Sequence, residues 1–245
     1  MNNFYILYRF FYKKLPFYTV FAAVILLMSQ FMLLVSYFLP IKIILLLSSP
    51  TVPHIVSSLF PHVGREEIIM ILTLCVFVVY GLHLGSEKYA ANLIDQISCH
   101  LLGMPETARL NHTSFEFKFV DSYIKSLSTL SLMTVLYLLI IFLYQFIAIA
   151  MLAYIVIIFF ILKIIKVGSH HLNSFFKLVS GLGFILVFVL EILDTLYLKS
   201  QEFSILNVLV ILIVSRYIFM RSLYLANKLT FLHSNTESFY LKVKA

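Results

Sequence analysis

Residues 127–167 read LSTLSLMTVLYLLIIFLYQFIAIAMLAYIVIIFFILKIIKV, and this stretch decides the fold class. It is apolar over about twice the length of one membrane-spanning helix, which needs roughly 20 residues. The polar break near its middle, Tyr144-Gln145-Phe146, predicts that it divides there into a helical hairpin. Helices are required in lipid because an open strand would leave its amide groups without hydrogen-bond partners.

Four further apolar runs are long enough to cross a bilayer, and the first of them is expected to end at Pro40. The expected spans are residues 17–39, 68–85, 127–144, 147–167, 175–196 and 203–223. Before them, residues 3–14 have the pattern of an amphipathic helix that lies in the membrane interface. Residues 86–126 form a long polar loop between the second and third spans. We therefore predict an all-α, polytopic integral membrane protein with six transmembrane helices in a single domain, residues 1–245.

The composition supports a lipid environment. Of the 245 residues, 62% are hydrophobic and 12% are charged, and the mean hydropathy is +1.01. Soluble domains carry roughly 45–50% apolar and about 25% charged residues, so a soluble fold of this composition could not cover its own surface. The net charge of +7 comes from basic residues at the ends of the apolar runs. That placement indicates contact with membrane lipid and argues against nucleic acid as a partner.

The basic residues also predict an orientation. With the N-terminus inside, 15 of the 18 Lys and Arg residues lie on the cytoplasmic side. The three left outside are Lys42, Arg65 and Lys199. Because cytoplasmic loops carry the excess of Lys and Arg, we expect a multi-pass protein of the inner (cytoplasmic) membrane with both termini in the cytoplasm.

Motifs of catalysis and metal binding are missing from the sequence. It has no phosphate-binding G-x-x-x-x-G-K-[ST] loop, no H-E-x-x-H, no Cys-x-x-Cys and no G-x-S-x-G. Cys75 and Cys99 do not have the spacing of metal ligands. We therefore expect no enzymatic activity, no catalytic residues, no cofactor and no metal.

Several short motifs follow one another in an informative order. They are EKYAANLID at 87–95, LLGMPE at 101–106, DSYI at 121–124, FSILNV at 203–208 and VSRY at 214–217. This order resembles the transmembrane domain of ABC exporters, in places that of type I secretion ATPases, over nearly the whole chain. The resemblance implies an interfacial elbow helix at residues 3–14. It also implies that residues 101–106 lead into a coupling helix that docks on an ATPase.

Two departures from that family affect the functional expectation. The nucleotide-binding domain that follows the spans in exporters is not in this sequence, so we expect a separate ATPase chain. The second cytoplasmic loop, residues 167–174, is much shorter than the family's paired helix extensions. Only the first cytoplasmic loop is then left to contact an ATPase.

The first cytoplasmic loop, residues 86–126, is the best candidate for a functional site. In the exporter-like interpretation its tip touches a partner through Met104, Pro105, Glu106, Thr107 and Arg109. The alternative is a solvated connector whose charges only keep it soluble. Loops of this length without a task are uncommon, which favours docking.

A few residues inside the spans carry competing interpretations. Gly81 and Gly85 form a small-x-x-x-small pair that predicts close helix packing, either within the chain or with another subunit. Glu191 and Asp194 share one helix face, and either line a deep cation or proton site or are wet at the interface. Arg216 either lines an inward-facing cavity or extends to the headgroups.

Three functions remain open at this point. The first is the membrane subunit of an exporter-like complex, as a homodimer or hetero-oligomer served by a separate ATPase. The second is an exporter-derived scaffold, sensor or immunity and accessory protein that does not transport. The third is an ion-coupled transporter using Glu191 and Asp194. The spans show no inverted repeat or broken-helix pattern, which places the third last.

Overall fold

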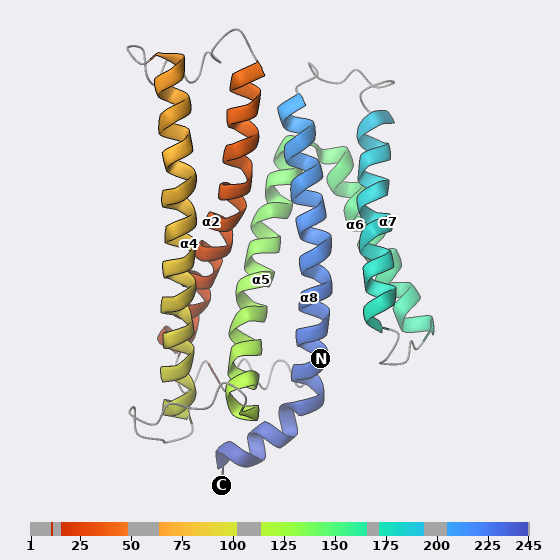
Figure 1. The fold of residues 1–245 in the computed structure, drawn as a ribbon. Coiled ribbons are helices and arrows are strands. Elements are labelled where there is room, and N and C mark those ends of the chain that lie inside the picture. The colour runs from red at the N-terminus through yellow and green to blue at the C-terminus, as the bar shows by residue number, and fades with distance from the viewer. Residues whose placement is uncertain are drawn as a thin grey trace. The chain divides into compact units, whose positions relative to one another are not determined.

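The computed structural model describes Phe11 and residues 16–48, 64–101, 114–165, 172–193 and 205–244, nearly all of them helical. The helices in this part of the chain are α2 (Pro16–Ser48), α4 (Arg65–Leu101), α5 (Phe115–Leu143), α6 (Gln145–Ile165), α7 (Leu172–Leu193) and α8 (Ile205–Lys244) (Figure 1). By length and composition, four of them can cross a membrane, over Phe17–Ser48, Arg65–Leu101, Phe115–Leu143 and Val208–Phe239. The all-α class predicted from the sequence is confirmed, with helices typical of an integral membrane protein.

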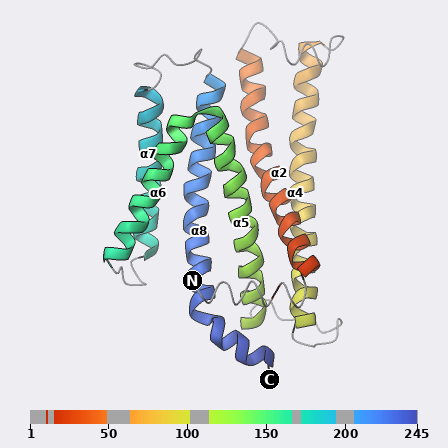
Figure 2. The ribbon, with the colours of Figure 1, turned by 180° about the vertical axis from the view of Figure 1, so that it is seen from behind.

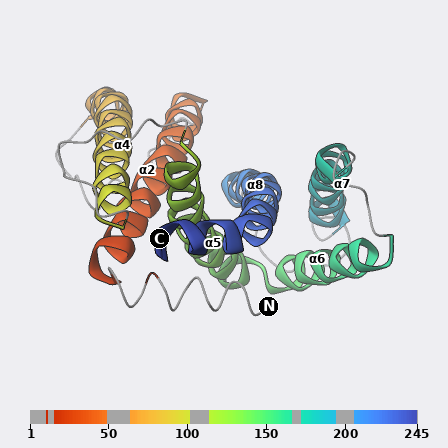
Figure 3. The ribbon, with the colours of Figure 1, turned by 90° about the horizontal axis from the view of Figure 1, so that it is seen from below.

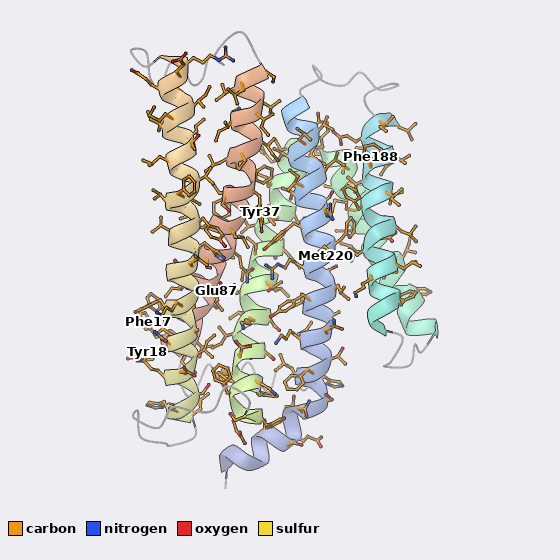
Figure 4. The ribbon with its side chains drawn as sticks, in the orientation of Figure 1. Phe17, Tyr18, Tyr37, Glu87, Phe188 and Met220 are labelled. Carbon is orange, nitrogen blue, oxygen red and sulfur yellow. The ribbon has the colours of Figure 1, made fainter. Side chains whose placement is uncertain are left out.

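Large apolar side chains on these helices face outward. Phe142 is 88% exposed and Phe77 is 72% exposed. Figure 4 labels others of this kind, including Phe17, Tyr37 and Met220. Such a surface suits lipid, because acyl chains are as apolar as these side chains.

The chain divides into two compact units, described here one at a time. The first unit covers Tyr5–Ile124 and contains α2, α4 and the beginning of α5. The second unit includes Lys125–Ala245 and contains the remainder of α5 with α6, α7 and α8.

In the first unit, α2 and α4 run antiparallel and side by side (Figures 1 and 2). Arg65, at the start of α4, donates from Nη2 to the carbonyl oxygens of Leu46 at 2.6 Å and Leu47 at 2.8 Å. These carbonyls belong to the last turn of α2, where no helical N–H reaches them and a positive charge is favourable. Arg65 therefore ties the beginning of α4 to the end of α2.

Pro40 does not end α2, as the sequence analysis expected, because the helix continues through it to Ser48. A proline removes its own N–H from the helical ladder and crowds the carbonyl four residues earlier, which can bend a helix without ending it. The backbone amide of every later residue still needs a hydrogen-bond acceptor, and in an apolar environment continuing the helix provides one within the same segment.

In the second unit, the long apolar stretch breaks at Tyr144, where the sequence predicted a break. Helix α5 ends at Leu143 and α6 begins at Gln145. The Tyr137 hydroxyl donates across this corner to the Ala148 carbonyl at 2.8 Å. Helix α6 runs back from the end of α5 but splays away from it (Figures 1 and 3), and it packs against α7. The splay follows from the one-residue connection, which is shorter than the 2–5 residues that bring two helices alongside each other.

Helices α6, α7 and α8 meet at Gly183 of α7. A Cβ built on Gly183 would lie 2.8 Å from Cε1 and Cζ of Phe219 and 2.8 Å from Cε1 of Tyr154. The rings of Tyr154 and Phe219 meet edge to face with centroids 5.7 Å apart. The Tyr154 hydroxyl also donates to the Val179 carbonyl at 2.7 Å. Glycine is required here because the two rings occupy the space of its missing side chain.

Helix α8 is longer than the predicted span 203–223. It continues to Lys244 and changes direction toward its C-terminal end (Figure 1). The predicted interfacial helix at residues 3–14 lies outside the described residues, with the exception of Phe11, which is helical.

Candidate functional site

The structure describes both flanks of the predicted first cytoplasmic loop, residues 86–126. Helix α4 continues to Leu101 and α5 begins at Phe115, so much of the predicted loop 86–126 is helical. Ser114 caps α5, because its Oγ accepts the Phe117 N–H at 3.3 Å. The expected tip residues lie outside the described residues: Met104, Pro105, Glu106, Thr107 and Arg109.

The part of α4 that continues past residue 85, which we call the α4 extension, has a buried face. Seven of the nine buried residues of α4 lie in it. Leu93, Ile94, Ile97 and Leu101 are between 1% and 8% exposed, and their spacing places them on one side of the helix. A connector whose only task is solubility needs no apolar face, so this pattern argues against that alternative.

The beginning of α5 has a buried face as well. Phe119, Val120, Tyr123 and Ile124 are at most 2% exposed. The ring of Phe11 stacks on that of Tyr123, with centroids 4.2 Å apart and an angle of 9° between the planes. The flanks of residues 102–113 are therefore packed helical structure.

A buried polar contact joins α2 to α4 in the first unit. Ser29 Oγ lies 2.8 Å from His83 Nδ1 and donates to the His83 carbonyl at 3.2 Å. His83 Nδ1 also lies 3.0 Å from the Ser29 carbonyl oxygen. One turn further along α4, Glu87 Oε2 is 3.7 Å from His83 Nε2, and Figure 4 labels Glu87. His83 is thus a helix-packing residue with satisfied hydrogen bonds.

The contacts of His83 are those of a helix-packing residue. Its Nδ1 lies within hydrogen-bond distance of both the hydroxyl and the carbonyl oxygen of Ser29. In either tautomer it therefore has a partner on α2: Nδ1 accepts from the Ser29 hydroxyl, or its N–H donates to the Ser29 carbonyl.

Gly81 and Gly85 do not take part in the packing of α2 on α4. A Cβ on either glycine would meet no atom within 4 Å. Each glycine is two residues from His83, or about 200° around a helix of 3.6 residues per turn. Within the described residues, a close helix approach occurs at Gly183, and packing of Gly81 and Gly85 against another subunit stays a prediction.

The structure describes two of the three candidate residues for an ion or substrate site. Glu191 of α7 is only 3% exposed, and both interpretations of its carboxyl stay predictions. Asp194 lies outside the described residues. Arg216 of α8 is exposed, and its guanidinium carbon lies 5.8 Å from the ring centroid of Phe184 on α7.

Sequence reasoning missed a regular feature of α8 that we call the cationic stripe: Tyr217, Arg221, Tyr224 and Lys228. Arg221 lies 5.0 Å from the ring centroid of Tyr217 and 5.8 Å from that of Tyr224. The Lys228 ammonium lies 5.6 Å from the centroid of Tyr224. The spacing of four, three and four residues on one helix face could have revealed it from the sequence.

The packed helices on either side of residues 102–113 and the exposed Arg216 of α8 are thus the two features on which a function can be argued. The exporter resemblance rests on the sequence motifs alone. Comparison with protein-family models, with curated proteins and with solved structures finds no match for this chain.

Proposed function

We propose that this chain is the membrane-spanning subunit of an exporter-like transport complex that depends on an ATPase carried by a separate chain. Residues 102–113, which include Pro105 and Arg109, are the segment that the ATPase contacts. The six spans with both termini in the cytoplasm belong to the same proposal, and so does assembly as a homodimer or hetero-oligomer.

The observation that carries this proposal is the buried face of the α4 extension. Ile94 and Ile97 are 1% and 2% exposed, although this segment lies outside the apolar part of the helix. Tyr123 of α5, on the other side of residues 102–113, is equally buried and stacks on Phe11. Force applied between two packed helices can be transmitted to both of them, because a buried helix cannot move without moving its neighbours.

The test is a pull-down of the tagged full-length chain in a gentle detergent, with the partners quantified by mass spectrometry. We expect one ATPase to co-purify in a fixed ratio. Pro105→Ala and Arg109→Ala should reduce the recovered ATPase at least tenfold, because truncating a central contact residue typically costs more than 1 kcal/mol and two such contacts exceed the 1.4 kcal/mol of one decade.

Lys88→Ala provides a matched control. It removes the same charge as Arg109→Ala, from an exposed position on the α4 extension, and should leave ATPase recovery unchanged. Elution of every variant as a single species in size-exclusion chromatography shows that the fold is kept. Full ATPase recovery with Arg109→Ala and Pro105→Ala would remove the docking claim.

One observation favours the second candidate, a scaffold that does not transport. Helix α6 ends at Ile165 and α7 begins at Leu172, so no long extensions surround the second cytoplasmic loop. The family resemblance places a second ATPase contact in that loop. A co-purifying partner with no nucleotide-binding domain would decide for the scaffold, since the transport proposal requires an ATPase.

A further inference from the structure

We infer that a surface shared by α7 and α8 binds a single-chain amphiphile with an anionic headgroup. This surface, which we call the Arg216 surface, consists of Arg216 and Met220 of α8 with Phe184 and Phe188 of α7. The inference does not depend on transport or on an ATPase, so it can fail or hold separately from the proposed function. It needs only that α8 crosses a membrane.

Arg216 lies at the depth of the hydrocarbon core. It follows the first residue of α8, Ile205, by eleven positions. At 1.5 Å per residue this is about 16 Å along the helix axis, in a core of about 30 Å. The side chain is exposed, and the residues between Ile205 and Arg216 carry no charge. A guanidinium at this depth is costly unless it faces water, a cavity or an anion.

A contact with α7 holds the guanidinium at this depth. Its carbon lies 5.8 Å from the ring centroid of Phe184, which is near the middle of α7 (Leu172–Leu193). The preceding residue, Gly183, is the point where α6, α7 and α8 meet, so the helix beneath the ring is firmly packed. The aromatic contact thus favours a position within the core over extension to the headgroups.

The positive charge of the Arg216 surface is complemented by an anionic ligand. An aromatic ring attracts a cation through its quadrupole but does not neutralise it. Helices α6, α7 and α8 as far as Thr236 contain a single acidic residue, Glu191. It lies seven residues from Phe184, or about 10 Å along α7. A guanidinium presents paired N–H donors to carboxylate, phosphate or sulfate oxygens, so a headgroup of this kind suits the site.

The rest of the Arg216 surface is apolar and accessible. Met220 is 57% exposed and Phe188 is 45% exposed, and Figure 4 labels both. Met220 is four residues from Arg216, and Phe188 is four residues from Phe184, so each shares a helix face with one member of the cation–ring contact. Because α7 and α8 are antiparallel and packed together (Figure 1), apolar side chains lie on both sides of this contact along the helix axes.

This combination of one cation and apolar side chains selects an amphiphile. A small inorganic anion would have to give up its hydration at an apolar surface, whereas an amphiphile is already in the bilayer and covers that surface with its alkyl chain. The phosphate of a bilayer phospholipid lies at the boundary, about 15 Å from the middle of the core. A single-chain ligand with a compact headgroup brings less polar material into the core.

The absence of tryptophan from the chain allows a direct measurement. Met220→Trp places one fluorophore in the Arg216 surface. The full-length variant is reconstituted in phosphatidylcholine bilayers and titrated with an alkyl sulfate brominated in its chain or, separately, with the brominated alcohol from which that sulfate is made. The sulfate should reach half-maximal quenching at an at least tenfold lower fraction, because hydrogen bonds to a charged group exceed the about 1.4 kcal/mol of one decade.

Charge-removing variants in the Met220→Trp background test the cause of that preference. Arg216→Gln should bring the two quenching curves together. Arg221→Gln is the matched control, because it removes the same charge from the same helix at a position about 140° further around it, and it should keep the preference. Equal quenching by the alcohol in all three proteins shows that the tryptophan has kept its place.

Four outcomes would overturn the inference. The first is equal quenching by the sulfate and the alcohol, and the second is a preference that persists in Arg216→Gln. The third is loss of the preference on addition of millimolar inorganic sulfate, which would assign the site to a small soluble anion. The fourth is quenching by the alcohol that increases as the protein is diluted in the bilayer, which would show that a second copy of the chain covers the surface.

The unmodified protein provides an independent check. Native mass spectrometry should find the alkyl sulfate retained by the wild type in preference to the alcohol, and should find this preference lost in Arg216→Gln. Such a result shows that the tryptophan reporter did not create the site. Retention of the sulfate by both proteins to the same extent would contradict the inference.

Discussion

The contact of three helices at Gly183 leads to a sharp prediction about stability. Gly183→Ala places a methyl group where Phe219 and Tyr154 atoms already lie 2.8 Å away. Neither ring can turn aside easily. Phe219 is 3% exposed, and the hydroxyl of Tyr154 is bonded to the Val179 carbonyl. The helices must therefore separate slightly, or the rings must leave their present contacts.

The free-energy cost of the clash at Gly183 can be isolated by comparison with a second glycine of the same helix. Gly181 is exposed, and a Cβ there meets nothing within 4 Å. Gly181→Ala should gain up to about 1 kcal/mol from helix propensity. Gly183→Ala has the same gain but loses about 1–3 kcal/mol through overpacking. The difference between the two variants cancels the propensity term and leaves the cost of the clash.

The assay is thermal unfolding of each variant in the same detergent, followed by the loss of the single peak in size-exclusion chromatography. A free-energy change of 1 kcal/mol moves the midpoint by roughly 2–4 °C for a chain of this size. Gly183→Ala should therefore unfold several degrees below Gly181→Ala. In a Phe219→Leu background the gap should narrow, because leucine lacks the two ring atoms that clash. Equal midpoints for the two alanine variants would refute the packing described for α7.

Three further predictions concern single side chains. Arg65→Met keeps the apolar stem but loses both bonds to the end of α2, and should lower the free energy of unfolding by about 1 kcal/mol; an unchanged unfolding midpoint would show that these bonds contribute nothing. Ser29→Ala and His83→Phe should be non-additive by about 0.6–2 kcal/mol in a double-mutant cycle, whereas strict additivity would mean that the two residues do not interact. Glu191→Gln should leave ATPase recovery and export unchanged, while loss of an ion-driven flux would favour the ion-coupled transporter.

The sequence was informative wherever apolar length alone decides the structure. The helical class follows from the length of the apolar runs, and the break at Tyr144 follows from the polar residue beside it. Helix ends were less predictable, because hydropathy reports where lipid ends and not where the helix ends. The α4 extension is charged, and hydropathy therefore placed it in a loop. Pro40 was misjudged for the related reason that a proline in an apolar helix does not have to stop it.

The candidate site was harder to predict, because it depends on contacts between distant residues. Ser29 and His83 are separated by 54 positions, and no local pattern pairs them. The spacing of Gly81 and Gly85 suggested a close approach, but only tertiary structure decides which glycine has a neighbour. The cationic stripe is different, since its spacing is local and could have been recognised from the sequence.

The contact between Ser29 and His83 has a consequence for membrane insertion. Helix α2 precedes α4 in the chain, so when helices enter the bilayer in chain order the Ser29 hydroxyl and carbonyl are present before His83. Alone among acyl chains, the imidazole N–H would have no acceptor, which costs several kcal/mol. We therefore expect α2 to act as an intramolecular insertion chaperone for α4, and expressing the two helices as separate chains should leave α4 poorly inserted.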